Sequence, residues 1–280
     1  MKPSQIDRVI HIALEEDVPF GDLTTQAFVP ATAQITAELV AREPGVFSGG
    51  EVFVRALTAL SSEVAVNLTV DEGAEFDQGQ VLAGISGPAR PILTCERIGL
   101  NLVQRMCGIA TTTAAYVAAV AGTRARIVDT RKTTPGLRAL ERHAVRCGGG
   151  HNHRFSLSDA VMAKDNHLAV VVAQGQDLAG AIRDAKAQLP HTVHLEVEVD
   201  RLDQIPAALH GGADTIMLDN FSVQDLRRGV DLIAGQALVE ASGGVRLDTV
   251  AEIAATGVDL ISVGALTHQV RALDLGLDFS

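Results

Sequence analysis

The second half of the chain alternates between short apolar runs and segments of helical pattern, and this rhythm limits the folds available to it. Strands joined by helix-length connections form parallel βαβ units. Six repeats predict an α/β fold, either a barrel or a doubly wound sheet. The expected strands contain Ile127-Val128, Val161–Ala163, Val193–Val199, Thr215–Leu218, Ala237–Glu240 and Leu260–Val263, and the expected helices are Pro135–Arg146, Leu178–Leu189, Val223–Ile233 and Leu247–Ala255.

The first third has a mixed pattern that indicates a separate α/β layer. Alternating apolar residues predict strands, and apolar residues at three- and four-residue steps predict helices. The long helical stretch Pro91–Ala121 is expected to break near Gly108. The other expected elements are helices at Pro3–Glu15 and Glu51–Leu60 and strands at Ala33–Ala41, Val64–Val70 and Val81–Ile85.

The composition excludes several classes of protein. Apolar residues make up 47% of the chain and charged residues 20%, which is typical of a globular protein rather than a disordered one. The formal net charge of −11 argues against bulk attraction to nucleic acid. The three cysteines form no Cys-x-x-Cys pair, and no signal peptide or membrane-spanning run is recognised. We therefore expect a cytoplasmic protein with reduced thiols.

A basic segment stands out within this acidic chain. Residues 124–164 contain nine Lys and Arg but three Asp and Glu, a local balance of +6. Arg138, Arg142 and Arg146 are spaced four apart and fit a solvated helix face. Arg131, Lys132 and Lys164 follow expected strands, and the carboxyl ends of parallel strands meet at one face of a barrel. Arg131, Lys132, Arg154 and Lys164 therefore predict a pocket for a polyanion.

Acidic and glycine-rich residues follow the later strands. Glu198 and Asp219 could hold Mg²⁺ or accept hydrogen bonds from sugar hydroxyls, or they could simply balance the basic cluster. Backbone N–H groups in a glycine-rich turn attract phosphate. His153 follows a glycine triplet and is interpreted as a neutral hydrogen-bond donor or an anion partner rather than a metal ligand. The glycine-rich zone contains Ser242, Gly243, Gly244, Gly264 and Ala265.

The motifs at these positions resemble those of the quinolinate phosphoribosyltransferases across nearly the whole chain. They are GDLTT (residues 21–25), DTRKTTPGLR (129–138), GGG (148–150), NHR (152–154), KDNH (164–167), EVEVD (196–200), LDN (218–220), ASGG (241–244) and VGALTH (263–268).

The resemblance implies an architecture and an assembly. An N-terminal α/β sandwich-like domain (residues 1–110) would precede an open, TIM-like α/β barrel with parallel strands (residues 111–268), and the tail (residues 269–280) could pack back on the first domain. The family forms a homodimer, or a higher oligomer, in which Arg97 of one subunit would enter the site of its neighbour.

The resemblance also implies a role for each site residue. Arg131, His153, Arg154 and Lys164 would bind quinolinate, together with Thr130 as a further substrate contact. Lys132 would lie near the diphosphate and the sugar. Glu198 and Asp219 would bind ribose hydroxyls and the Mg²⁺ cofactor, and with Lys132 they form the expected catalytic set. Ser242, Gly243, Gly244, Gly264 and Ala265 would cradle the 5′-phosphate.

The implied reaction belongs to pyridine nucleotide and NAD biosynthesis. A pentosyltransferase of this family, a kind of glycosyltransferase, joins quinolinate to phosphoribosyl diphosphate and releases diphosphate and CO₂, giving nicotinate mononucleotide. Three other interpretations remain open from the residues. They are a Schiff-base aldolase using Lys164, a transport-associated relative with a changed substrate, and a non-catalytic anion sensor.

Overall fold

The structure is a computed structural model that describes residues 1–279, and the chain divides into two compact units. Unit 1 comprises Met1–Ala114, Thr133–Gly149 and Leu266–Ser280, and unit 2 comprises Ala115–Lys132 and Gly150–Ala265. Compactness thus groups residues 133–149 with unit 1, whereas the boundaries expected from the sequence place them with the barrel. Those boundaries stay predictions.

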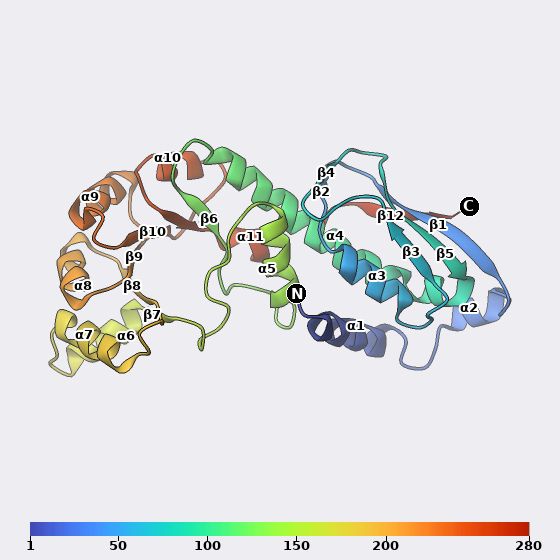
Figure 1. Ribbon diagram of the computed structural model, residues 1–280, viewed down its shortest axis with the longest axis horizontal. Helices are drawn as coiled ribbons and strands as arrows, with labels where there is room; N and C mark the ends of the chain where they lie inside the picture. The colour runs from blue at the N-terminus through green and yellow to red at the C-terminus, as the bar shows by residue number, and fades with distance from the viewer. Residues whose placement is uncertain (280) are drawn as a thin grey trace. The chain divides into compact units, whose positions relative to one another are not determined.

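Unit 1 is built on a four-stranded antiparallel sheet in the order β12-β1-β5-β3 (Figure 1). Its core is formed by apolar side chains such as Phe47, Phe53 and Leu82, which are fully buried. The strand nearest the chain's end pairs with the first strand, with Ala37 opposite Phe279. The strands are β1 (Gln34–Ala41), β3 (Ala65–Leu68), β5 (Val81–Pro88) and β12 (Leu275–Phe279), and β2 (Gly45–Val46) pairs separately with β4 (Glu75–Phe76).

The helices of unit 1 bury apolar faces against this sheet and against each other. Helix α1 (Pro3–Asp17) packs against α3 (Gly50–Thr58), and α3 packs against β3. Helix α2 (Leu23–Phe28) is short and was not expected from apolar spacing. It is fixed by Asp22, whose side chain accepts a hydrogen bond from the Thr25 N–H at 2.9 Å.

Helix α4 (Ala89–Ala119) is continuous, so the expected break near Gly108 is wrong. A side chain at this position would meet the Arg271 carbonyl oxygen at 2.2 Å. The glycine therefore allows the backbone at Arg271 to approach the helix closely, and it does not end the helix. The other faces of α4 bury Cys95, Ile98 and Met106, as their spacing predicts.

Helix α5 (Arg138–Cys147) begins three residues later than expected. Gly136 has a φ of +83°, which lies outside the helical region, so Pro135 belongs to a turn and not to the first turn of the helix. The turn is closed by the Leu137 N–H, which donates to the Thr134 carbonyl at 3.0 Å. The helix ends at Cys147, one residue beyond the predicted end at Arg146, and Gly148 caps it.

Unit 2 contains the expected parallel sheet, with six strands in the order β6-β11-β10-β9-β8-β7. An isolated parallel bridge joins Val128 to His151 at the β6 side of the sheet. The sheet is the open α/β barrel that the family resemblance implies, which is one of the two architectures that the strand–helix rhythm allows. Its strands are β6 (Arg126–Val128), β7 (Val161–Ala163), β8 (Leu195–Val199), β9 (Thr215–Asp219), β10 (Leu238–Ser242) and β11 (Leu260–Ser262).

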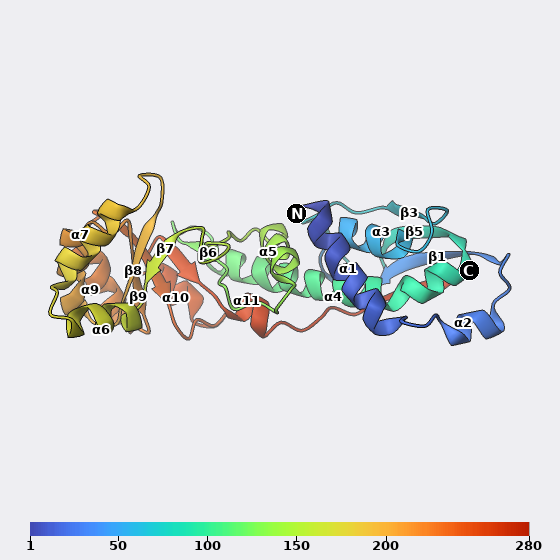
Figure 2. The ribbon, with the colours of Figure 1, turned by 90° about the horizontal axis from the view of Figure 1, so that it is seen from below.

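Helices connect these strands, and Figures 1 and 2 both place α7 and α9 beside β8 and β9. Two of the helices, α6 and α8, were not expected. In α6, the β-branched run Val170–Val172 favours a strand in a prediction from sequence. The start of this helix is capped by His167, whose Nδ1 accepts the Lys164 N–H at 3.0 Å. The elements are α6 (Asp165–Ala173), α7 (Leu178–Gln188), η1 (Leu202–Gln204), α8 (Ile205–Gly211), α9 (Val223–Ile233), α10 (Val250–Ala254) and α11 (Ala265–His268).

Strand alternation sorts the side chains of unit 2 between helices and barrel interior. On β8, Leu195, Val197 and Val199 alternate with Glu196 and Glu198, and all five are buried. The two glutamates therefore share the interior face, one level apart along the strand. Among residues 1–279, no helix has the length and apolarity required to cross a membrane.

Candidate active site

A pocket of about 380 Å³ lies in unit 2 at the carboxyl ends of the strands. Residues of the predicted basic and acidic zones line this one space, whereas the predicted glycine-rich zone contributes only Ser242. Three lining residues were not expected: Met162, Met217 and Ser262. The sequence signal that could have identified them is their position on the strands, facing the barrel interior. The lining residues are Thr130, Arg131, Lys132, His153, Arg154, Met162, Lys164, Glu198, Met217, Asp219, Ser242 and Ser262.

The basic side chains reach the pocket from three segments. Arg131 and Lys132 follow β6, Arg154 precedes β7, and Lys164 directly follows β7. Arg154 is held by its Nη1, which donates to the Ala160 carbonyl at 2.9 Å. Burial and the nearby charge of Arg131 lower the pKa of Arg154. The two guanidinium groups thus repel each other, and an anion between them would relieve that repulsion.

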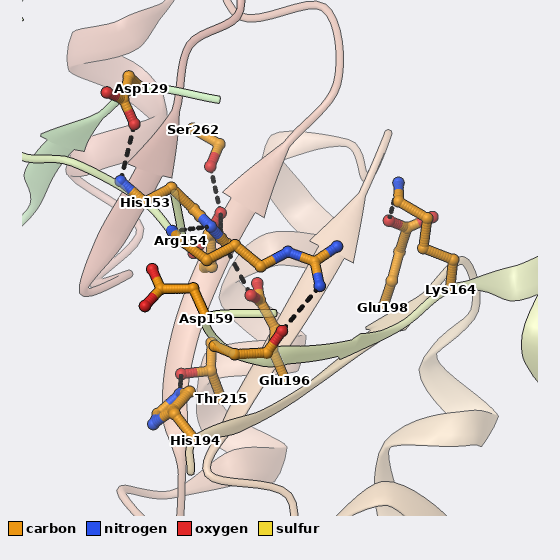
Figure 3. Close-up of polar contacts among 12 residues, drawn as sticks. Asp129, His153, Arg154, Asp159, Lys164, His194, Glu196, Glu198, Thr215 and Ser262 are labelled. Atoms are coloured by element: carbon orange, nitrogen blue, oxygen red, sulfur yellow. Dashed lines mark hydrogen bonds and ion pairs between the residues drawn. The ribbon is translucent and has the colours of Figure 1, made fainter. Parts of the chain in front are cut away.

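The acidic residues of the pocket already have partners. Lys164 Nζ donates to Glu198 Oε2 at 3.0 Å, as Figure 3 shows. Asp219 Oδ2 accepts a hydrogen bond from Asn220 Nδ2 at 2.6 Å. Both carboxylates can offer hard oxygen ligands to Mg²⁺, and Glu198 would have to exchange Lys164 for the ion. Their predicted role as metal ligands stays a prediction.

His153 lies at the floor of the pocket and contacts a lower layer of the barrel (Figure 3). Its Nε2 lies 3.0 Å from Glu196 Oε2 and 3.6 Å from Glu240 Oε1. Its backbone N–H donates to Asp129 Oδ1 at 2.7 Å, and its Nδ1 accepts the Arg154 N–H at 2.7 Å. The ring therefore spans two levels of the barrel and has a partner on each nitrogen.

The protonation of this layer follows from its contacts. Burial acts to lower the pKa of His153, but the Glu196 hydrogen bond and the charge of Glu240 raise it overall. The Arg154 N–H opposes that increase, because a protonated Nδ1 could not accept it. The neutral Nε2–H tautomer satisfies both ring contacts. The role of His153 as a neutral donor or as a partner of the anion stays a prediction.

Two carboxyl groups lie below His153. Burial and the charge of Glu196 raise the pKa of Glu240 to about 8, so Glu240 keeps its proton at neutral pH. Glu240 is 1% exposed and accepts a hydrogen bond from the Ser262 hydroxyl. Within residues 1–279, Glu196 Oε1 is buried and lacks a hydrogen-bond partner. A proton shared between the two carboxyl groups would supply that partner.

The glycine-rich loops after β10 and β11 follow the pocket strands, although of the expected phosphate cradle only Ser242 lines the pocket. Gly243 has a φ of +92°, and a side chain there would meet Asn220 Oδ1 at 2.2 Å. Gly244 has a φ of +60° with open space around it. Gly264 follows β11, and Ala265 begins α11.

Arg97 is the one predicted site residue that belongs to unit 1. It lies on α4 and is exposed. Arg105, on the same helix, is not free for a site. It forms an ion pair with the buried Glu141 at 2.6 Å and donates to the Thr267 carbonyl at 2.9 Å. Helix α4 therefore carries one arginine that is engaged in an internal ion pair and one that is exposed.

The fold and the pocket together define a class of protein: an open α/β barrel with a cation-rich pocket at the carboxyl ends of its strands. Two family models match the chain in succession. Residues 22–107 match the quinolinate phosphoribosyl transferase N-terminal domain, and residues 109–278 match the C-terminal domain. The chain belongs to the quinolinate phosphoribosyl transferase family.

Individual relatives agree with this assignment. A nicotinate-nucleotide pyrophosphorylase [carboxylating] from Mycobacterium leprae is 48% identical, with 96% of this chain and 95% of the relative covered. A probable enzyme of the same name from Bacillus subtilis is 40% identical over 99% of this chain and 94% of its own. The crystal structure of NadC from Streptococcus pyogenes has a TM-score of 0.93 and 41% identity, covering 100% of this chain and 99% of that one.

Proposed function

We propose that the protein transfers the phosphoribosyl group of phosphoribosyl diphosphate to quinolinate with loss of CO₂, giving nicotinate mononucleotide for NAD biosynthesis. The observation that carries the proposal is the convergence of Arg131, Lys132, Arg154 and Lys164 on one pocket. Two polyanionic substrates repel each other, and this group of cations offsets the repulsion. The names of the relatives and the family models support the same reaction.

Quinolinate is assigned to the part of the pocket around Arg131, His153, Arg154 and Lys164. A guanidinium group binds a carboxylate through two parallel hydrogen bonds, each contributing on the order of 1.5–3 kcal/mol. Two arginines match the two carboxylates of the substrate. Because Lys164 is paired with Glu198, a carboxylate that engages Lys164 would also release Glu198.

Phosphoribosyl diphosphate is assigned to the remaining part of the pocket. Lys132 would neutralise the diphosphate, and Glu198 and Asp219 would hold ribose hydroxyls and Mg²⁺. The ion, when bound, would stabilise the negative charge that grows on the departing diphosphate. Ser242, Gly243, Gly244, Gly264 and Ala265 would donate hydrogen bonds to the 5′-phosphate, and Thr130 would contact the substrate beside Arg131.

The chemistry requires no protein nucleophile. The pyridine nitrogen attacks the anomeric carbon while the bond to diphosphate breaks, through a transition state with oxocarbenium character. The ring nitrogen then carries a positive charge, so the bond between the adjacent ring carbon and its carboxylate can break and release CO₂. The electron pair left on that carbon is stabilised beside N⁺ until a proton is added.

The Schiff-base alternative is disfavoured by the contacts of Lys164. An aldolase lysine must be unprotonated to attack a carbonyl. Lys164 Nζ donates a hydrogen bond to the buried carboxylate of Glu198 at 3.0 Å, so this amine is already engaged in an ion pair. Lys164 is therefore better suited to binding an anion than to forming a covalent intermediate.

The assembly and the location complete the proposal. We propose a homodimer in the cytoplasm, in which Arg97 of each subunit enters the active site of its partner. The exposure of Arg97, beside an Arg105 that is fully engaged, supports this role.

The decisive experiment is product formation from quinolinate and phosphoribosyl diphosphate with Mg²⁺, with nicotinate tested in parallel. The expected result is nicotinate mononucleotide and CO₂ from quinolinate and no product from nicotinate, because only quinolinate places a carboxylate on each arginine. Turnover of nicotinate at an equal rate would contradict the assignment of the two arginines. A folded protein inactive with both substrates would contradict the proposed reaction and favour the relative with a changed substrate.

A further inference from the structure

A second cluster of chemically reactive side chains lies in unit 1, which does not contain the active-site pocket. Glu72 lies in the turn between β3 and β4, and His143 and Cys147 lie on α5. The spacing of four residues places the imidazole and the thiol on the same face of that helix. His143 Nε2 lies 2.9 Å from Glu72 Oε2, and Cys147 Sγ lies 3.1 Å from the same oxygen. The three ligand atoms all lie within 4.8 Å of one another.

The carboxylate of this cluster is oriented by the backbone. Glu72 Oε1 accepts the N–H groups of Gly49 at 2.9 Å and Gly50 at 2.6 Å, at the start of α3. Oε2 also accepts the Gly49 N–H, at 3.1 Å, and faces the imidazole and the thiol. Hydrogen bonds that fix a ligand's orientation are the usual outer shell of a metal site. Glu72 is thus preorganised before any ion arrives.

A buried hydroxyl lies beside the thiol of this cluster. Although burial acts to raise it, hydrogen bonds from His143, Cys147 and the Gly50 N–H lower the pKa of Glu72 to about 2, so it is charged. Burial raises the pKa of the Cys147 thiol to about 12, whereas the nearby Ser48 hydroxyl acts to lower it. Ser48 is fully buried, and in the described part of the chain its Oγ has no hydrogen-bond partner that meets the geometry of a bond. A thiolate at Cys147 would give this hydroxyl a stronger acceptor.

We propose that Glu72, His143 and Cys147 form a binding site for a divalent cation of the zinc class, separate from the active site. One carboxylate oxygen, one imidazole nitrogen and one thiolate sulfur are ligands that zinc accepts, and a water molecule would complete a tetrahedral shell. A thiolate selects against Mg²⁺, which prefers oxygen ligands. The ion replaces the thiol proton, which leaves to solvent, and the site becomes neutral with two anionic ligands and a +2 charge.

The geometry needs only a small adjustment. Ligand atoms around tetrahedral zinc are separated by roughly 3.4–3.6 Å, given the usual bond lengths to nitrogen, oxygen and sulfur. The present separations of 2.9 and 3.1 Å are hydrogen-bond distances, and side-chain rotation can open them. The contact that must change is Arg146 Nη2 with His143 Nδ1 at 3.4 Å, because binding through Nε2 leaves the proton on Nδ1. Arg146 is exposed and can turn away.

The test is a titration of the full-length protein with Co²⁺, which substitutes for zinc and absorbs strongly in the near ultraviolet when bound to thiolate. The expected result is one equivalent bound with a thiolate-to-cobalt band, which Zn²⁺ or a chelator abolishes and excess Mg²⁺ does not. Cys147→Ala should abolish the band, and His143→Gln should weaken binding at least tenfold. Cys95→Ala is the matched control, because it removes another thiol and should leave the band unchanged.

Two further measurements keep the outcome clear. Metal-free variants are compared with the parent protein by circular dichroism and melting temperature, so that loss of the band is scored only in folded protein. The paired variant Glu198→Gln with Asp219→Asn should retain the band, which separates this site from the proposed Mg²⁺ site. Failure of wild-type protein to show a thiolate band, or a band that persists in Cys147→Ala, overturns the proposal.

Discussion

His153 donates from Nε2 toward Glu196 Oε2, 3.0 Å away, and so connects the floor of the pocket with a buried acidic layer of the barrel. The side chain of His153 is 13% exposed and that of Glu196 5% exposed. The orientation of the ring is therefore set from below by a residue that does not line the pocket. Changes in the acidic layer should reach the substrate through this ring rather than through a direct contact.

The raised pKa of Glu240 in the buried acidic layer predicts that the free energy of unfolding depends on pH. Burial and the charge of Glu196 raise the pKa of Glu240 to about 8, so folding favours its protonated form. The unfolded state loses this proton near pH 4.5 and the folded state near 8, so this contribution falls as pH rises between those values. Its slope is at most about 1.4 kcal/mol per pH unit.

Glu240→Gln checks this contribution, since glutamine imitates the protonated group. Urea unfolding at pH 5.5 and pH 7.5 should show that the free energy of unfolding falls less in the variant than in the parent protein. Asp248→Asn is a suitable control, because Asp248 is a surface carboxylate on the same unit. Equal slopes in Glu240→Gln and the parent protein would mean that Glu240 is ionised in the folded state.

Lys132→Ala should reduce kcat far more than stability. Lys132 lies in the pocket opposite the proposed diphosphate, and removal of one group that stabilises transition-state charge typically costs about 10²–10³ in kcat. Steady-state kinetics with quinolinate and phosphoribosyl diphosphate measure the loss. Lys186→Ala, which removes a lysine outside the pocket lining, should retain turnover. Unchanged turnover in Lys132→Ala would remove Lys132 from the mechanism.

A mixing experiment tests whether Arg97 acts across a dimer. Arg97→Ala and Lys132→Ala should each be nearly inactive alone. If each site combines Lys132 of one subunit with Arg97 of the other, half of randomly mixed dimers carry one intact site, and activity recovers to roughly a quarter of the parent level. The proteins are mixed, exchanged under mild denaturation and assayed. If confirmed mixed dimers recover no activity, Arg97 does not enter the active site of the partner subunit.

The loop after β10 offers a paired test of the phosphate cradle. Gly243→Ala would place a methyl group 2.2 Å from Asn220 Oδ1, whereas Gly244→Ala meets open space, and both glycines have positive φ. Both variants therefore share the backbone cost of about 1 kcal/mol, but only the first displaces the loop. Gly243→Ala should raise the KM for phosphoribosyl diphosphate at least tenfold more than Gly244→Ala. Equal effects would show that the loop's position does not matter.

The sequence predicts much of the barrel because its signals are local. Apolar strand runs and helical spacing depend on near neighbours, and Val223–Ile233 is found with the expected bounds. The expected break at Gly108 fails because the glycine accommodates Arg271, which is distant in sequence. Helix α6 was missed for a different reason: its β-branched run favours strand, and the cap that overrides this preference is a histidine side chain.

The site shows the same division between local and distant information. Most of the basic and acidic side chains of the pocket follow or end strands, so their meeting is expected once the strands are parallel. The pairing of Lys164 with Glu198, and of His153 with Glu196, depends on which strands are neighbours and on their depth in the barrel. Spacing along the chain indicates neither which strands are neighbours nor how deep in the barrel a residue lies. Glu196 and Glu198 also differ in partner although only one residue separates them.

The pairing of β12 with β1 has a consequence for the order in which the protein matures on the ribosome. Strand β1 emerges early, but its partner β12 follows the whole of unit 2 in the chain. Until then β1 has an unpaired edge, which is a template for wrong pairing. A nascent chain halted before β12 would therefore combine a fully translated barrel with an unfinished sheet.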